Sequence, residues 1–113
     1  MDVGMKKENR FEALVYEKQV NICKAFANPI RLRILDLIAQ RPRAASELQE
    51  GLSISKANLS QHITILRSAG VVVTHREGKQ VYCSLAIPEV KQACQLIRDV
   101  LRAQIRTGQQ LAL

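Results

Sequence analysis

The side chains best suited to recognition chemistry lie in residues 52–70, LSISKANLSQHITILRSAG. On a helical wheel the apolar residues Leu59, Ile63 and Leu66 share one face, because spacings of three and four return to the same side of a helix. The opposite side carries hydrogen-bonding side chains of little bulk, namely Lys56, Ser60, Gln61, Thr64 and Arg67. The pattern predicts a helix that packs by one face and presents the other to a groove of another molecule.

The ends of this helix and the segment before it are well marked. Ser55 is a typical N-cap residue, and Gly70 is suited to end the helix. Residues 44–50 predict a short preceding helix anchored by Leu48, which Gly51 should end. Two short helices joined by a tight glycine-containing link predict a helix-turn-helix.

The distribution of charge favours an acidic partner for this region. The net charge is +7, from 17 Lys plus Arg against 10 Asp plus Glu, and no acidic residue occurs between Gly51 and Arg76. A basic, carboxylate-free surface suits a phosphate backbone, whose counterions are released when Lys or Arg approach. A solvated basic face, a membrane surface or an acidic protein are the alternatives that charge alone leaves open.

The rest of the chain predicts elements that hold this helix in place. Residues 8–26 and 29–40 are expected to be helices separated by Asn28-Pro29, and Arg41-Pro42 should end the second. Residues 71–76 and 80–85 alternate like strands around a tip at 77–79, which makes a wing. Pro88 should open a last helix, and we expect a second subunit to cover the apolar stripe on it. The stripe is formed by Val90, Ala93, Cys94, Ile97, Val100, Leu101 and Ile105.

The fold class expected from these elements is mainly α with a small β-hairpin, a winged helix-turn-helix. A length of 113 residues suits one DNA-binding domain over residues 1–113, with residues 1–7 and 107–113 flexible. No apolar run is long enough to span a membrane, and the charged N-terminal residues do not form a secretory signal. We therefore expect a cytoplasmic protein without a membrane partner.

Three cysteines are the remaining candidates for chemistry. Their odd number and lack of paired spacing indicate reduced thiols. Cys94 lies on the apolar stripe of the last helix and Cys23 lies beside the stripe of the first, so a redox or sulfur switch and simple hydrophobic packing are both open. Cys83 alternates with Val81 and Leu85, which predicts a place in the core of the wing.

Four segments together resemble the ArsR/SmtB family of winged helix-turn-helix repressors. They are ANPIRLRIL at residues 27–35, SKANLSQH at 55–62, LRSAGV at 66–71 and REGKQVYCSL at 76–85. The resemblance covers roughly residues 20–100 in the expected order. It implies a homodimer, with the first and last helices at the interface, that binds a double-stranded operator of dyad symmetry and is released by an inducer.

The resemblance also implies which residues contact DNA. The family's contacts fall on Lys56, Ala57, Ser60 and Gln61, with Thr64 and Arg67 near the groove edge. Gln61 could read adenine by two hydrogen bonds, while Lys56 could reach guanine or a phosphate. In the wing, Arg76 and Lys79 flank the tip and are expected to meet phosphates of the minor groove. His62 lies toward the apolar side of the helix, so it is expected to be a packed, hydrogen-bonded histidine.

The inducer site departs from the family pattern. Family members that bind soft metals carry Cys-x-Cys where this chain has Ala44 and Ser46. Members that bind zinc use His and carboxylate ligands in the last helices, whereas residues 88–106 contain no His and only Glu89 and Asp99. Zinc sensing is therefore not expected. Two cysteines whose Cα atoms approach within roughly 7 Å could form a disulfide or polysulfide link. A dimer through the first and last helices could bring Cys23 and Cys94 together, which makes them the candidates for a thiol switch. An arsenite site that also uses Cys83 across a dimer is the alternative.

Other classes of function fit the sequence less well. Only two histidines are available, no glycine loop could cradle a phosphate, and no acid–base carboxylate pair stands out, so an enzyme is not expected. A protein–protein adaptor would keep the interface helices but would not need a carboxylate-free face. The sequence therefore favours a DNA-binding transcriptional regulator.

Overall fold

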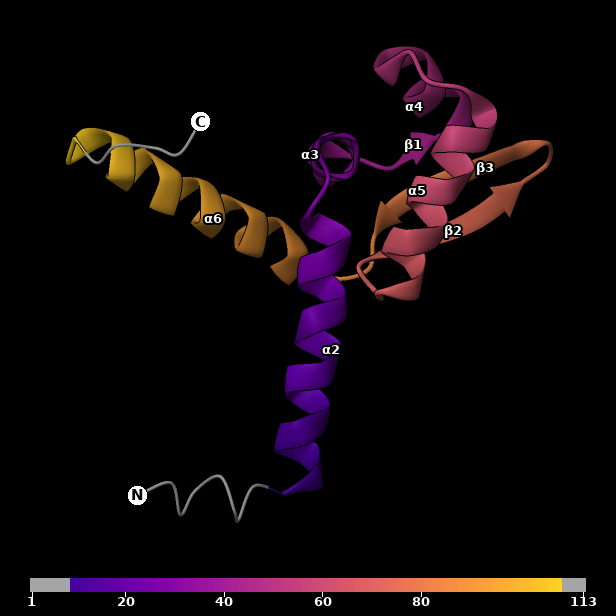
Figure 1. Ribbon diagram of the computed structural model, residues 1–113. Coiled ribbons are helices and arrows are strands. Elements are labelled where there is room, and N and C mark those ends of the chain that lie inside the picture. The colour runs from indigo at the N-terminus through magenta and orange to yellow at the C-terminus, as the bar shows by residue number, and fades with distance from the viewer. Residues whose placement is uncertain (1–8, 109–113) are drawn as a thin grey trace.

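The computed structural model describes residues 9–108 and shows a winged helix-turn-helix (Figure 1). The predicted flexible residues 1–7 and 109–113 lie outside the described part, whereas Thr107 and Gly108 complete the backbone bonds that end the last helix. The elements are α2 (Arg10–Phe26), α3 (Pro29–Gln40), β1 (Arg43–Ala44), α4 (Ala45–Leu52), α5 (Lys56–Ser68), β2 (Val72–Glu77), β3 (Gln80–Leu85) and α6 (Glu89–Arg106). The predicted fold class is confirmed, with a short additional strand before α4.

Helix α5 begins and ends as its sequence predicts. The Ser55 hydroxyl accepts a hydrogen bond from the Asn58 amide at 3.1 Å, and Gly70 has φ of 80° just after the helix. The expected end of α4 was wrong: Gly51 is helical, and Ser53 takes the left-handed conformation with φ of 55°. The extra turn buries Leu52, which is 5% exposed, and this gain explains why the helix continues past the glycine.

Asn28 separates α2 from α3. Its Oδ1 accepts from the amides of Ile30 at 2.9 Å and Arg31 at 3.1 Å, and Pro29 occupies the first turn, where no amide donor is needed. One side chain thus satisfies two of the free amides that begin α3.

Replacing Asn28 by alanine should lower the free energy of unfolding by about 1 kcal/mol, because both α3 amides lose their acceptor. Thermal or urea unfolding would measure the change. The matched control is Asn58→Ala, in which the same substitution is made at an exposed position within α5. Equal stability of the two variants would show that the Asn28 cap contributes nothing.

The three-stranded sheet has the order β1-β3-β2 and is antiparallel throughout. Glu77 pairs with Gln80, so the wing tip is the two-residue loop Gly78-Lys79, with Gly78 at φ of 62°. Strand β1 was not expected from the sequence. It pairs with β3 through Arg43 opposite Cys83, which ties the helix-turn-helix to the wing.

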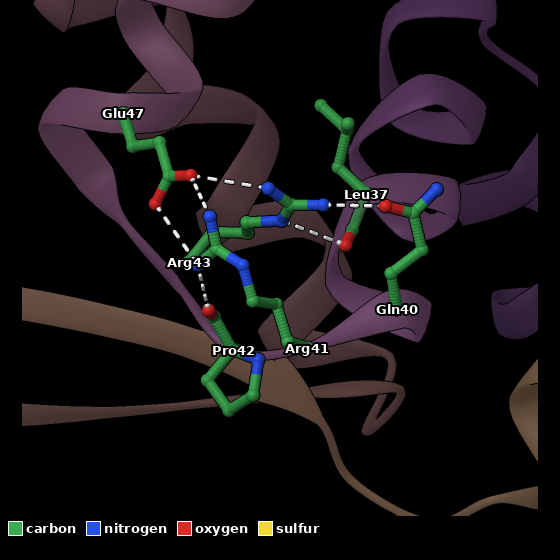
Figure 2. A network of polar contacts seen from close by, with 6 residues as sticks. All are labelled: Leu37, Gln40, Arg41, Pro42, Arg43 and Glu47. Atoms are coloured by element: carbon green, nitrogen blue, oxygen red, sulfur yellow. Dashed lines mark hydrogen bonds and ion pairs between the residues drawn. The ribbon is translucent and has the colours of Figure 1, made fainter.

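A polar network around Arg43 fixes α4 to the end of α3 (Figure 2). The Arg43 guanidinium donates to the Leu37 carbonyl at 2.9 Å, the Gln40 amide oxygen at 2.6 Å and the Glu47 carboxylate at 3.1 Å. Arg41 binds the same carboxylate, and both arginines, Arg41 first, lower the pKa of Glu47. The helix that precedes α5 is therefore anchored at its first turn.

The core lies where α3, α4, α5 and the wing meet. Its most deeply buried large side chains are Ile34, Leu35, Leu48, Leu66, Val72 and Cys83. Helices α2 and α6 extend away from this body in different directions (Figure 1). Among the described helices, none is both long and apolar enough to cross a membrane.

The outer parts of α2 and α6 leave large apolar side chains in solvent. On α2, Ile22 and Phe26 pack against the core while Phe11 is 69% exposed. On α6, Val90 and Cys94 are buried, whereas the rest of the predicted stripe is open: Ile97, Val100, Leu101 and Ile105. Patches of this kind mark surfaces that contact another protein.

Candidate nucleic-acid interface

A groove of about 480 Å³ runs between α5 and the wing, which lie side by side in Figure 1. We call it the α5–wing groove. Six of the eight predicted DNA-contacting residues line it, namely Lys56, Ser60, Thr64, Arg67, Arg76 and Lys79. Residues of the helix-turn-helix and of the wing, from Ala45 to Cys83 along the chain, therefore form one surface.

The packing of α5 explains why these side chains point outward. Leu59, Ile63 and Leu66 are 3%, 8% and 0% exposed, as the helical wheel predicts. Ala57 and Gln61 are also exposed, but they do not line the groove. Their wheel positions put them on the flank of α5 farther from the wing, so the helix offers a polar surface on two sides.

The wing is held against α5 by a direct hydrogen bond. Arg67 donates from Nη1 to the Thr74 hydroxyl of β2 at 3.1 Å. The sequence marks Arg67 as a groove-edge residue but gives no sign of this bond. It keeps one cation of the groove in place and sets the spacing between the helix and the wing.

The electrostatics of the α5–wing groove favour an anion. Among the described residues, its lining includes four cations, Lys56, Arg67, Arg76 and Lys79, and no carboxylate. Glu77 is the last residue of β2, next to the wing tip. Its carboxylate is 3.4 Å from His75 Nε2 and lies outside the groove lining. The predicted carboxylate-free surface is thus assembled in space and is not only a feature of the sequence.

The structure adds residues that the sequence did not assign to DNA contact. Ser46 and Gln49 of α4 and Gln80 of β3 line the same groove. Ser46 lies in the first turn of α4, and a helix N-terminus presents free amides to an anion. Its position in the first helix of the predicted helix-turn-helix was the signal that could have found it.

His62 is a packed histidine, as predicted, and not part of the exposed face. It is partly buried, and its Nδ1 lies 3.3 Å from Nη1 of Arg31. Burial and, secondarily, the positive charge of Arg31 lower the pKa of His62 below its ordinary value of 6.5. The ring is therefore neutral at neutral pH.

The three thiols lie in three different places within one chain. Cys23 is exposed and lines a shallow hollow on α2 with Tyr16 and Val20. Cys83 is 1% exposed in the wing core, as predicted, and burial raises the pKa of its thiol. Cys94 is 7% exposed and lines a hollow of about 280 Å³ between α3 and α6.

An ion pair lies beside Cys94. The ion pair between Arg98 and Asp36 lines the same hollow and links α6 to α3. Burial raises the pKa of Cys94; Arg98 opposes the rise and Asp36 adds to it. Within residues 9–108, no three His, Cys, Asp or Glu side chains gather where they could hold a metal ion.

Comparison with known proteins connects this geometry to a family. A helix-turn-helix domain model matches residues 26–75. The HTH-type transcriptional regulator Rv0081 of Mycobacterium tuberculosis is 35% identical over 88 residues, 77% of each chain, and its crystal structure aligns with a TM-score of 0.76 over 82% of this chain and 94% of that one at 33% identity. The transcriptional repressor SdpR of Bacillus subtilis is 40% identical over 65 residues, 58% of this chain and 72% of SdpR.

A further solved structure matches nearly the whole chain. It is the homodimeric winged helix-turn-helix DNA-binding domain of Mb0332 from Mycobacterium bovis, a possible ArsR-family regulator. It aligns with a TM-score of 0.78 and 26% identity over 94% of this chain and 97% of that domain. These relatives are transcriptional regulators, which agrees with the expectation that the chain is not an enzyme.

Proposed function

Because the chain belongs to the ArsR-type family of winged helix-turn-helix transcriptional regulators, we propose that it is a repressor that binds a dyad-symmetric operator as a homodimer and leaves it when its thiols are modified. The observation that carries the DNA-binding part is the α5–wing groove, with its four cations and no carboxylate among the described residues. A repressor acts where its operator DNA lies, so the proposed function implies a cytoplasmic site of action.

The recognition chemistry follows from the side chains on α5. Gln61 can donate to N7 and accept from N6 of an adenine, and Lys56 can donate to guanine or to a phosphate. Ser60 can bond to a base or to the backbone, while Arg76 and Lys79 supply phosphate contacts from the wing. Helix α5 thus reads the major groove and the wing fixes its position along the duplex.

Two copies of the chain are needed for a dyad-symmetric site. The exposed apolar residues of α2 and α6 would supply the surface for a second copy. That the Mb0332 domain is homodimeric supports the assembly of two copies. In such a dimer the two α5 helices would contact half-sites about 34 Å apart, one turn of DNA. The apolar side chains left in solvent by a single chain would then be buried.

The release step is proposed at Cys23 and Cys94. A dimer in which α2 and α6 meet would bring these thiols near one another, and their oxidation would form one S–S bond while two electrons pass to the oxidant and two protons to solvent. The exposed Cys23 is the thiol that an oxidant reaches first, and the buried Cys94 then closes the bond. A bridge between the interface helices would change the separation of the two α5 helices.

The two alternatives to a thiol-switch repressor are an arsenite-responsive repressor and a protein–protein adaptor. Arsenite would need three thiolates, and the separate places of Cys23, Cys83 and Cys94 in one chain mean that it would need thiols from both subunits. An adaptor would use the apolar faces of α2 and α6 without the groove. An arsenite-responsive repressor would be released from DNA by arsenite alone. An adaptor would not need the exposed side chains of α5 for its function.

We expect an oxidant or a persulfide donor to release the reduced dimer from its own promoter DNA, because linking the thiols repositions α5. Gel-shift or fluorescence anisotropy measurements, first under reductant and then with oxidant, persulfide donor or arsenite, would detect release. The variants Cys23→Ser and Cys94→Ser should each remain bound.

The matched control is Cys83→Ser, which should still be released, since that thiol lies in the wing core and not on the interface helices. Release by arsenite alone would move the protein to the metalloid class. Release of the wild type together with both serine variants would reject the thiol switch while leaving the DNA-binding function intact.

A further inference from the structure

Arg31 connects three helices through a single guanidinium group. Its Nε donates to the Ala25 carbonyl at 2.7 Å and its Nη2 donates to the Lys24 carbonyl at 3.2 Å, both in the last turn of α2. Its Nη1 lies 3.3 Å from Nδ1 of His62, at the middle of α5. Arg31 itself is in the first turn of α3, where Asn28 accepts from its amide.

The two contacts to α2 complete the end of that helix. The last carbonyls of a helix have no partner within it, and the C-terminal end carries partial negative charge. The guanidinium gives the Ala25 carbonyl a donor, adds a second donor to the Lys24 carbonyl, which also accepts from the Ala27 amide at 3.2 Å, and places positive charge at this end. The orientation of the Arg31 side chain is therefore set by α2 before it meets α5.

The contact to α5 depends on the protonation state of His62. An arginine has only donors, so Nδ1 of His62 must be the acceptor, and the proton of the neutral ring is on Nε2. A proton on Nδ1 would remove the acceptor and set two positive charges side by side. Because the pKa of His62 is lowered, the acceptor is present at neutral pH and is lost only as the pH falls through a value below the ordinary 6.5.

The charged groups around His62 agree with this dependence. Arg31 of α3 is the charge that acts on the ring within the described residues, and α2 contributes the Lys24 and Ala25 carbonyls that already accept from the same guanidinium. On α5 itself, the neighbours of His62 are Gln61, which is neutral and exposed, and Ile63, which is buried. No carboxylate of the described residues hydrogen-bonds the ring to offset a second positive charge.

We propose that Arg31 is a positioning residue for DNA recognition, which holds α5 against the end of α2 through the neutral ring of His62. This inference rests on the proposed DNA-binding function. The ring lies next in sequence to Gln61, so the contact restrains the turn of α5 that carries a base-reading side chain. Loss of the contact lets this turn move, and affinity falls with the fraction of protein that keeps the competent orientation.

The inference predicts that DNA binding weakens on acidification. Affinity for the duplex that the wild type selects from a random pool should fall about three- to tenfold from about pH 8 to about pH 5.5, the range expected for one lost hydrogen bond. Acidification adds positive charge, which by itself strengthens binding to DNA. A weakening therefore has the sign opposite to that of the added charge, as the loss of a positioning contact predicts.

The chain has two histidines, which provides a matched pair of variants. His62→Asn keeps an acceptor near the place of Nδ1 but does not titrate, so it should retain more affinity than His62→Leu and lose the acid-dependent weakening. His75→Asn alters the exposed wing histidine and should leave that weakening unchanged. Persistence of the wild-type pH profile in His62→Asn would overturn the proposal.

A second readout does not depend on DNA. The His62 titration followed by NMR should move toward the ordinary histidine value in Arg31→Met, because the neighbouring positive charge is removed. An unchanged titration would reject the contact in solution. If the NMR shift is seen but the wild type selects no duplex, the proposed function fails and not the contact, so the two failures are distinguishable.

Discussion

Replacing Gln61 by alanine should weaken operator binding at least about thirtyfold while the protein stays folded and dimeric. Gln61 is exposed on α5, so its removal leaves no cavity. A two-bond contact to one base contributes about 1–3 kcal/mol of discrimination, and a dimer loses it in both half-sites. Anisotropy titration against the selected duplex measures the loss, and discrimination should relax at the adenine that Gln61 reads.

The Lys56→Ala variant, measured in the same anisotropy titration, distinguishes a phosphate contact from a base contact. If Lys56 binds a phosphate, its removal should weaken all duplexes alike and make the dependence on salt less steep by about one ion for each subunit. Gln92→Ala on the exposed face of α6 is the control for replacing a polar helix residue. Unchanged affinity in both α5 variants would reject the assignment of α5 as the recognition helix and favour the adaptor.

The recognition helix could be predicted because its signals are local. Ser55, Gly70 and the buried triplet Leu59, Ile63 and Leu66 all lie within one short segment, and periodicity and capping act over that range. The same is true of the wing, where alternating residues flank a glycine. The exposed side chains of α5 followed, because knowledge of the buried side of a helix also identifies the exposed side.

The contacts that position the helix could not be predicted. Arg31 and His62 are separated by 31 residues, Arg98 and Asp36 by 62, and β1 forms only because β3 lies beside it. None of these partners leaves a local pattern, since each depends on how the helices cross. The distance between Cys23 and Cys94 in the proposed dimer could not be predicted either, because it depends on how a second subunit binds.

One of these contacts brings the proposed sensor close to the recognition helix. Cys23 directly precedes Lys24, whose carbonyl accepts from Arg31, and Arg31 in turn contacts His62. A bond formed at Cys23 therefore acts on the same turn of α2 that Arg31 binds. The proposed sensing thiol and the proposed recognition helix are thus connected through Arg31 and His62, and the sequence positions 23, 31 and 62 give no sign of that proximity.

Introducing glutamate at Ile97 and Leu101 should convert the dimer into monomers. These side chains are 57% and 45% exposed in the single chain and lie one turn apart on α6, so the substitution leaves the core of the subunit intact. In a dimer they would be buried, and each apolar side chain placed there contributes about 1.5–3 kcal/mol. With glutamate at both positions, the dimer would lose this stabilisation and would have to bury carboxylates without partners, which is unfavourable. Sedimentation or light scattering would measure the change in mass.

The matched control is Gln92→Glu, which adds the same side chain to the opposite, exposed side of α6 and should leave the dimer intact. DNA affinity should fall sharply in the double variant although α5 is unchanged, because a monomer holds only one half-site and loses the gain from binding two linked sites. A variant that remains dimeric would show that α6 is not the interface, and it would also remove the route by which Cys94 could meet Cys23. The oligomeric state of this one variant therefore tests both the assembly and the geometry on which the thiol switch depends.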